Sequence, residues 1–468
     1  MIRTIAAALA ALSLAGCATP ALRSAAQPVT AVVTSADGAQ RLSPQPVAAT
    51  PETTALRITV DPDTRHQTMV GFGASITDAS AILIDALPQD RRDALIRELF
   101  GRGEGGLGLD FTRLTIGASD FSPTHYSFDD MPAGERDSDL RRFSINPNRA
   151  DVLPVLKSAL AVNPDLVVMA SPWSPPGWMK TSDSMIGGTL RPDAYDVYAR
   201  YFARYLQAYR AEGVAIRYLT IQNEPDFSPT DYPGMKWPAV DRARFVGQHL
   251  GPLLEREGLA TRILDWDHNW DQPEQPLTVL RDPAATRYVA GTAWHCYAGN
   301  VSAQTPVHEA FPDRETFFTE CSGGEWRPGW ATGLSDAVGL MIDTTRGWAK
   351  GVLLWNLALD PRNGPQLGGC RTCRGVVRID PATGAVEREV DYYALGHLSR
   401  FVRPGAHRIG STSGEAGVKT VAFRNADNGS LVLLAFNGAE EPRPLRIEAP
   451  GRSFGFTLAP GSAATFAW

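Results

Sequence analysis

The chain has 468 residues, of which 43% are hydrophobic and 21% are charged. It is therefore long enough to bury a large core and to form more than one domain. The formal net charge of −6 offers no basic surface for a polyanion, so we expect no nucleic-acid partner. Eleven Trp and twelve Tyr are available either to stack on sugar rings or to pack the core.

Residues 1–17 have the pattern of an export signal rather than of folded structure. Arg3 supplies a positive charge, residues 5–14 form a short apolar segment, and residues 14–17 read Leu-Ala-Gly-Cys. This last segment resembles the lipobox of bacterial lipoproteins, which implies lipidation of Cys17. An ordinary signal peptide cut near Ala18 is the alternative.

We expect a bacterial envelope lipoprotein that touches a membrane only through its lipid anchor. No later stretch is long and apolar enough to span a bilayer. Ala18 and Thr19 provide no acidic retention signal for the inner membrane, which favours the outer membrane or a periplasm-facing position.

Residues 18–54 are rich in Ala, Pro, Thr, Ser and Gln, a composition that predicts a flexible linker. Residues 55–65 include the apolar run 56–60, which we expect to form a strand that joins a C-terminal β-domain.

Between residues 66 and 400, short apolar runs alternate with amphipathic helical stretches. The eight runs are 68–75, 111–117, 166–173, 218–225, 262–268, 288–297, 316–321 and 351–359. Eight strand–helix units predict a (β/α)8 TIM barrel. The alternative, an open dinucleotide-binding sheet, is rejected because Gly71-Phe72-Gly73 is not followed by the remaining glycine of that fingerprint.

Residues 401–468 have a different pattern, with short apolar runs separated by turn signals such as Asn428-Gly429 and Pro460-Gly461. No helical period is visible. The segment predicts a fused β-sandwich domain.

Four cysteines remain after Cys17, and an even number in an exported chain suggests disulfides. Cys370 and Cys373 form a C-x-x-C in a Gly-rich loop, where a local disulfide is favoured because no second ligand pair for zinc stands nearby. Cys296 and Cys321 would then pair across neighbouring strands, if their Cβ atoms face each other.

Glu224 and Glu320 each end an apolar run, which is how a barrel enzyme places an acid at its catalytic face. They follow the fourth and seventh predicted strands, so both reach the same end of the barrel. Two such carboxylates are what glycoside hydrolysis requires. We interpret Glu224 as the general acid/base and Glu320 as the nucleophile of a retaining enzyme.

Polar and aromatic side chains end most of the other strands, and together they are hard to explain by packing. We expect substrate contacts from Asp78, Arg113, Trp173, Asn223, His268, His295, Tyr297 and Trp355. Arg113 would also keep the nucleophile ionised through a charge-assisted pair.

These motifs resemble glycoside hydrolase family 30, which includes glucosylceramidases and endo-β-1,6-glucanases. The resemblance is carried in order by segments 71–78, 113–122, 171–180, 223–225, 295–297, 319–321 and 355–359. It implies a TIM barrel fused to a β-sandwich and a retaining mechanism that needs no metal or cofactor. It also implies the same roles for Glu224 and Glu320.

Segment 264–270, with 294–299 and the Cys370–Cys373 loop, looks more like bacterial members near the β-1,6-glucanases. We therefore expect a carbohydrate or glycoconjugate substrate, with β-1,6-glucan or a related β-glucoside favoured. The alternatives are a glucosylceramidase, a β-xylosidase or a β-fucosidase of the same family, or a surface glycan-binding lipoprotein without activity.

Overall fold

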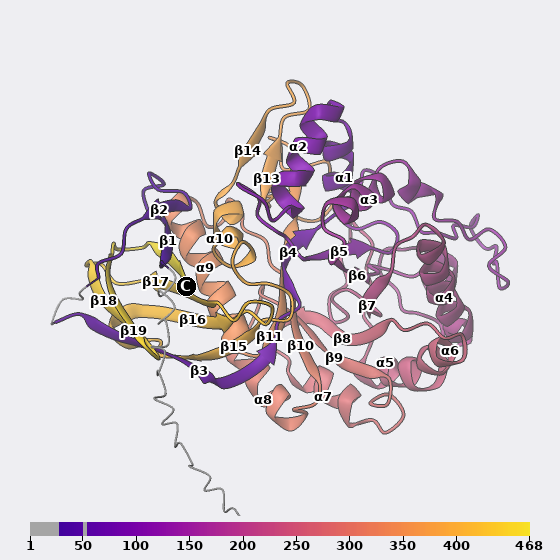
Figure 1. The fold of residues 1–468 in the computed structure, drawn as a ribbon. Helices are drawn as coiled ribbons and strands as arrows, with labels where there is room; N and C mark the ends of the chain where they lie inside the picture. The colour runs from indigo at the N-terminus through magenta and orange to yellow at the C-terminus, as the bar shows by residue number, and fades with distance from the viewer. Residues whose placement is uncertain (1–27, 50–53) are drawn as a thin grey trace, which may run out of the picture.

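The computed structural model describes residues 28–49 and 54–468, which form a barrel and a β-sandwich lying side by side (Figure 1). Cys17 and its lipobox lie outside the described residues. Within the described ranges, no helix is both long and apolar enough to cross a membrane.

Eight parallel strands close the barrel in the order β10-β11-β4-β5-β6-β7-β8-β9. Their bounds are β4 Gly71–Ser75, β5 Phe111–Thr115, β6 Val167–Ser171, β7 Ile216–Thr220, β8 Arg262–Asn269, β9 Val289–His295, β10 Glu315–Glu320 and β11 Ala349–Asn356. The predicted (β/α)8 barrel is confirmed. Its eighth run continues past Asn356 into β12 (Ala358–Leu359), which leaves the barrel to pair with β13 (Val377–Ile379) and, through it, β14 (Val386–Arg388).

Helices connect the barrel strands and cover their outer side (Figure 1). They are α1 Asp78–Asp85, α2 Gln89–Phe100, α3 Val152–Val162, α4 Tyr195–Ala211, α5 Ala239–Phe245, α6 Gly251–Arg256, α7 Glu274–Arg281, α8 Gln304–Ala310, α9 Trp330–Arg346 and α10 Val390–Ser399. Both α9 and α10 also contact sandwich strands, so these two helices join the domains.

The sandwich is a folded sheet in the order β19-β18-β3-β15-β16-β17-β20-β1-β2. Its strands are β1 Thr30–Thr34, β2 Ser43–Gln45, β3 Leu56–Thr68, β15 His407–Ser411, β16 Val418–Arg424, β17 Leu431–Asn437, β18 Arg443–Ala449, β19 Arg452–Leu458 and β20 Ala463–Ala467. The long β3 pairs with β18 through its first residues and with β15 through the rest. The chain segment before the barrel is thus built into the C-terminal domain.

The prediction of a flexible linker over residues 18–54 is wrong for the part that the structure describes. β1 pairs along its whole length with β20, and Val32 and Val33 are buried. Thr34 also hydrogen bonds to the buried His397 of α10 at 2.9 Å. The apolar, β-branched core of β1 is only a few residues long, so the polar composition of the surrounding segment concealed it.

The barrel interior is stacked in two layers that follow from strand alternation. The lower layer is apolar and contains Phe111, Met169, Tyr218, Leu264, Ala293, Phe317 and Leu353. On these strands other than β8, the residues two positions further along enter the same interior nearer its carboxyl end. Most of that upper layer is polar: Arg113, Ser171, Thr220, His295 and Thr319 are all buried. The lower layer is therefore a packed floor for a polar site.

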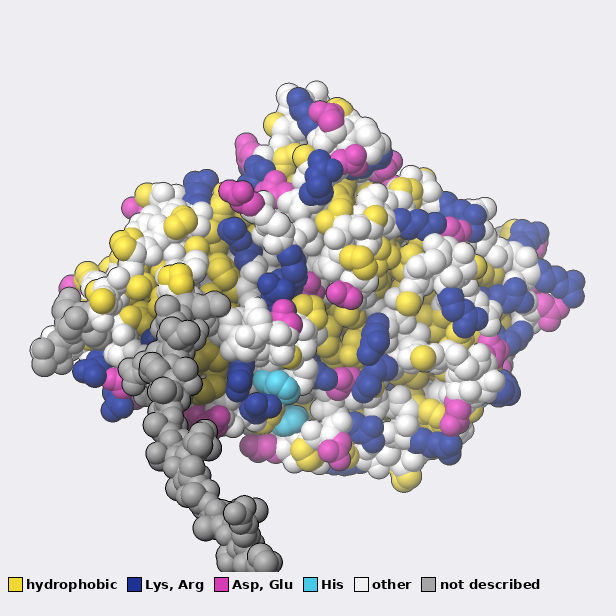
Figure 2. Space-filling view, viewed as in Figure 1, with side chains coloured by type: hydrophobic (Ala, Val, Ile, Leu, Met, Phe, Trp, Pro, Cys, Tyr) yellow, Lys and Arg dark blue, Asp and Glu magenta, His cyan; other side chains and the backbone are white. Residues whose placement is uncertain are grey.

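Disulfides join Cys296 to Cys321 and Cys370 to Cys373. The first links the ends of the neighbouring strands β9 and β10, and the second closes a loop after β12. On the face shown in Figure 2, Lys and Arg side chains are interspersed with Asp and Glu.

Candidate active site

Glu224 lies in the loop after β7, four residues beyond the end of that strand. Its backbone has a φ of +47°, a conformation that is uncommon for a residue with a side chain and that recurs at active sites. Its N–H donates to the carbonyl of Asp267 at 3.0 Å, and the N–H of Asn223 donates to the carbonyl of Pro172. These bonds fix a loop that carries its carboxylate into the barrel mouth.

Glu320 is the last residue of β10 and is buried. Arg113 of β5 donates to one carboxylate oxygen, and the hydroxyl of Tyr297 donates to the other at 2.9 Å. Both donors favour the ionised form of Glu320.

The two glutamates share one imidazole. Nδ1 of His295 lies 3.1 Å from Oε1 of Glu224 and 3.9 Å from Oε1 of Glu320. The structure therefore brings together, across three strands, the two carboxylates that the sequence places 96 residues apart.

Asp267 is a residue that sequence analysis missed, and it forms the centre of the polar layer. Its carboxylate accepts hydrogen bonds at 2.6–3.0 Å from donors on five other barrel strands: Arg113, Ser171, Thr220, His295 and Thr319. One fully buried anion thus connects the ends of six consecutive strands.

A β-bulge aims Asp267 inward. The pairing of β8 with β9 shifts register between Trp266 and His268, and Trp266 and Asp267 have φ values of +80° and +51°. Bulges of this kind re-aim side chains next to active sites. Asp265, two residues earlier, instead points outward to Arg242 of α5 at 2.9 Å. Alternation alone therefore gives no signal for Asp267.

Charges in the site are strongly perturbed by burial and by one another. Burial opposes ionisation of Asp267, but Arg113 and His295 hold the pKa of its carboxyl well below the usual range. Burial alone would lower the pKa of His295, yet the charge of Glu320 and the hydrogen bonds to Asp267 and Glu224 raise it to about 9. At neutral pH, His295 is therefore a cation that donates to acids on both sides.

The two glutamates are perturbed in opposite directions by their surroundings. Burial disfavours the charge of Glu224, but the nearby imidazole of His268 and the hydrogen bond from His295 outweigh it and lower the pKa of Glu224. Burial raises the pKa of Glu320, while His295 and Arg113 oppose the rise. In the substrate-free site, the proton that Glu224 and His295 share lies on the imidazole.

Trp173 and Trp355 form an aromatic wall. Their rings stack at 4.9 Å with an interplanar angle of 19°. The Arg113 guanidinium lies 4.8 Å from the Trp173 ring, within cation–π range. This wall fixes the arginine that contacts Glu320 and Asn223.

Asp120 is a second residue that sequence analysis missed as a site residue, although it lies within a quoted motif. It is buried, and burial together with the charges of Glu320 and Glu224 raises its pKa to about 8. The sensitivity to both glutamates places it at the same site. A buried, protonated carboxyl can both donate to and accept from a sugar hydroxyl.

Asp78 is buried, and its contact with substrate stays a prediction. It begins α1, and both carboxylate oxygens accept from the hydroxyl of Tyr126 at 3.0–3.1 Å. Burial raises its pKa to about 6. The next residue, Ala79, packs in one cluster with Trp173 and Trp355 of the site.

Within the described ranges, one group brings three potential metal-ligand atoms within 4.8 Å of one another: Glu224, His268 and His295. The charged form of His295 donates from both nitrogens, to Glu224 and to Asp267 at 3.0 Å. It has no lone pair left for a metal in that form. Nδ1 of His268 lies 3.5 Å from Glu224, so the group is suited to holding a carboxylate and a proton.

A closed barrel with two buried carboxylates, an arginine and a tryptophan wall at its mouth has the construction of a glycoside hydrolase. Residues 69–402 match the glycosyl hydrolase family 30 TIM-barrel domain, and residues 405–466 match the β-sandwich domain of that family. The chain belongs to glycosyl hydrolase family 30 and is an O-glycosyl hydrolase. This confirms the family that the sequence motifs resemble.

The similar proteins within the family include both endo-1,6-glucanases and glucosylceramidases. The chain is 36% identical over 441 residues to an endo-1,6-β-D-glucanase of Neurospora crassa, covering 90% of each chain. It is 30% identical over 446 residues to the lysosomal acid glucosylceramidase of Mus musculus, covering 89% of this chain and 84% of the relative. A solved endo-β-1,6-glucanase superposes with a TM-score of 0.87 at 33% identity, covering 94% and 99% of the two chains.

Proposed function

We propose that this protein hydrolyses β-1,6-glucan with retention of configuration, with Glu320 as nucleophile and Glu224 as acid/base. The observation that carries the assignment of roles is the asymmetry of their partners. Glu320 receives an arginine and a tyrosine hydroxyl, which suit a carboxylate that must be ionised. Glu224 faces two histidines, which suit a group that must gain and lose a proton.

In the first step, an oxygen of Glu320 forms a bond to the anomeric carbon, and the bond from that carbon to the glycosidic oxygen breaks. The departing oxygen keeps the electron pair and takes a proton from Glu224. A sugar that displaces water from Glu224 favours its neutral form, so the proton passes from His295 to the carboxylate over 3.1 Å.

In the second step, a water molecule gives a proton to Glu224 and attacks the anomeric carbon. The ester to Glu320 breaks, and its electron pair returns to the carboxylate. Two inversions at one carbon retain the β configuration. Arg113 and Tyr297 stabilise the carboxylate of Glu320 before and after the covalent intermediate.

The linkage is supported by the endo-1,6-glucanases among the relatives. Hydrolysis of β-1,6-glucan, glucosylceramide and aryl β-glucoside, xyloside and fucoside tests it, with the glucan expected to be the best substrate. Preferred hydrolysis of glucosylceramide, or of a xyloside or fucoside, would select one of the alternatives instead. No hydrolysis of any of these substrates would overturn the proposed β-1,6-glucanase function and favour glycan binding without turnover.

The residue roles are tested by Glu320→Ala and Glu224→Gln, which should each remove most activity without unfolding the protein. Added azide distinguishes the roles. Attack on the substrate in Glu320→Ala should give the α-glucosyl azide, whereas interception of the covalent intermediate in Glu224→Gln should give the β-glucosyl azide. The opposite products, or near-normal turnover, would overturn the assignment.

We also propose that the protein is exported as a lipoprotein anchored at Cys17, on the basis of the lipobox sequence. The test is mass spectrometry of the mature N-terminus from membranes, with Cys17→Ser as control. A mature chain that begins near Ala18 without lipid would show an ordinary signal peptide.

A further inference from the structure

Large aromatic side chains are exposed at three positions of the described chain: Phe227, Tyr297 and Trp326 are 47%, 44% and 50% exposed. All three lie in loops that follow barrel strands, at the same face as the two glutamates. Exposed apolar side chains that gather on one face are more informative than single ones, because such groups often mark ligand surfaces. Their place indicates a ligand surface that extends beyond the catalytic pair.

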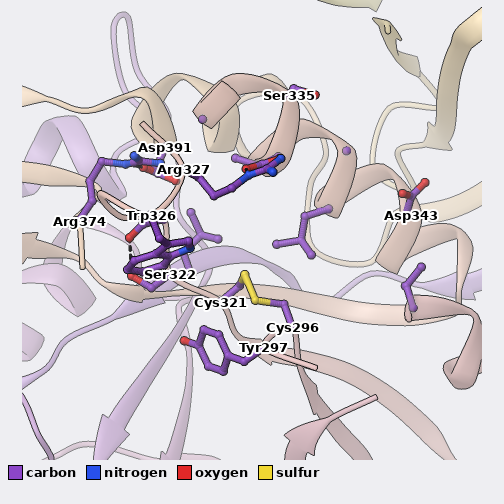
Figure 3. Close-up of a pocket in the computed structure, with 18 of the residues that line it drawn as sticks. Cys296, Tyr297, Cys321, Ser322, Trp326, Arg327, Ser335, Asp343, Arg374 and Asp391 are labelled. Atoms are coloured by element: carbon purple, nitrogen blue, oxygen red, sulfur yellow. Dashed lines mark hydrogen bonds and ion pairs between the residues drawn. A yellow bond between two sulfur atoms is a disulfide. The ribbon is translucent and has the colours of Figure 1, made fainter. Parts of the chain in front are cut away.

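A groove of about 570 Å³ contains two of these rings. It lies between the segment after β9 and helix α9, and Trp326, Tyr297 and the Cys296–Cys321 disulfide line it together (Figure 3). Its volume is in the range of small-molecule sites. Because the hydroxyl of Tyr297 donates to Glu320, the groove begins one side chain away from the nucleophile.

The loop that carries Trp326 is held from both sides. At its start, Cys321 is bonded to Cys296. Further along, Glu325 N–H donates to Thr372, and Gly323 accepts from the N–H of Arg374. The partner loop is itself closed by the Cys370–Cys373 disulfide.

Trp326 is also held by close packing against the backbone. A Cβ atom at Gly324 would lie 2.0 Å from the indole ring, so the ring rests directly on this glycine. An exposed ring that is fixed in this way loses little freedom on binding.

The remaining walls combine apolar residues, among them Val301, Leu340 and Leu354, with three charged pairs. Arg327 contacts Asp336, Arg374 contacts Asp391, and Lys419 contacts Asp343. An alkyl chain in this groove would exclude water from these charged groups and would not replace the hydrogen bonds that water makes to them. Sugar hydroxyls can replace those bonds while the ring faces stack on Trp326 and Tyr297. The chemistry favours a carbohydrate over a lipid.

We propose that the groove between Tyr297 and Trp326 binds a second glucosyl portion of the β-glucan chain, outside the catalytic pocket. This rests on the proposed function. The groove makes long substrates bind better than small glycosides, whereas the glutamates act on both alike.

The experiment compares Trp326→Ala with wild type on short and long gentio-oligosaccharides and on 4-nitrophenyl β-glucoside. We expect kcat/KM for the long chains to fall about tenfold, mainly through KM, and the aryl glucoside to change less than about twofold. Trp326→Phe should retain most of the preference for long chains, because a ring remains. Val240→Ala, at a residue 62% exposed on α5, is the surface control and should match wild type.

Equal losses on all substrates, or none on the long chains, would overturn the groove proposal alone. A loss confined to dispersed glucosylceramide would overturn it in favour of a lipid. A wild type that cleaves no gentio-oligosaccharide would overturn the proposed function as well, so the two failures are distinguishable. Unchanged thermal midpoints would show that the variants fold.

Discussion

Asp267→Asn tests whether one buried anion organises the catalytic site. All five side-chain partners of Asp267 donate hydrogen bonds to it. An amide replaces one acceptor oxygen with two donor hydrogens, which must then face donors. It also removes the charge that compensates Arg113 and His295.

The expected loss of stability is about 3 kcal/mol, at the lower end of what breaking a buried ion pair costs, because Arg113 keeps Glu320 as a partner. The direction in which this stability changes with pH follows from the pKa of Asp267, which folding holds well below its usual value. Its stabilising contribution is fully present above about pH 4 and is lost as the pH falls further. Urea denaturation at several pH values measures both effects.

The expected loss of kcat is about 100-fold, the effect of removing one preorganised electrostatic contact from an active site. Without the Asp267 charge, the pKa of His295 falls, so the alkaline limb of the activity profile should move to lower pH. A general loss of stability would not cause that shift.

Asp265→Asn is the matched control. Asp265 lies on the same strand as Asp267, and the substitution breaks its buried ion pair with Arg242 of α5, outside the catalytic network. It should lose stability but keep its turnover and pH profile. Wild-type kcat and an unmoved alkaline limb in folded Asp267→Asn would refute the role of Asp267.

Other predictions concern titration, cysteines and the N-terminal strand. Because the pKa of His295 is raised to about 9, wild-type kcat/KM should fall as the pH rises through about 9, and a profile that stays flat well beyond it would contradict the role of the His295 cation. The stability that this histidine contributes is fully present below about pH 6.5 and should be lost as the pH rises through about 9. Thiol titration of denatured, unreduced Cys17→Ser protein should find almost no free thiol, whereas two or more would refute full pairing. Replacing Cys296 and Cys321 by Ser should lower the free energy of unfolding by about 3 kcal/mol, as measured in urea, and no change would show that the crosslink is dispensable. A chain that begins after β1 should melt at lower temperature than one that begins at residue 28, because it exposes the edge of β20, and equal midpoints would contradict this.

Much of the barrel was predictable because its signals are local. Each strand is a short apolar run, and each is separated from the next by a helical period or a loop. Glu224 and Glu320 were found because strand ends in a barrel share one face. Arg113, His295 and Tyr297 were found for the same reason, and the structure places all three against a glutamate.

Residues whose role depends on non-local contacts were not predictable in this way. The hydrogen bond from Tyr126 to Asp78 joins residues 48 positions apart, which no local pattern indicates. Burial, together with the charges of carboxylates far along the chain, raises the pKa of Asp120. β1 was hidden in a polar segment and is stabilised only by pairing with the last strand of the protein.

By itself, the sequence determined the family, the barrel and the identity of the two glutamates, since these depend on short patterns and their order. Only the tertiary structure decided that Asp267 lies at the centre of the site. A bulge in β8 reverses which of its residues face inward, and the carboxylate of Asp267 can accept from donors on five other strands only after the barrel has closed. The same closure sets Tyr297 between Glu320 and the groove beside Trp326.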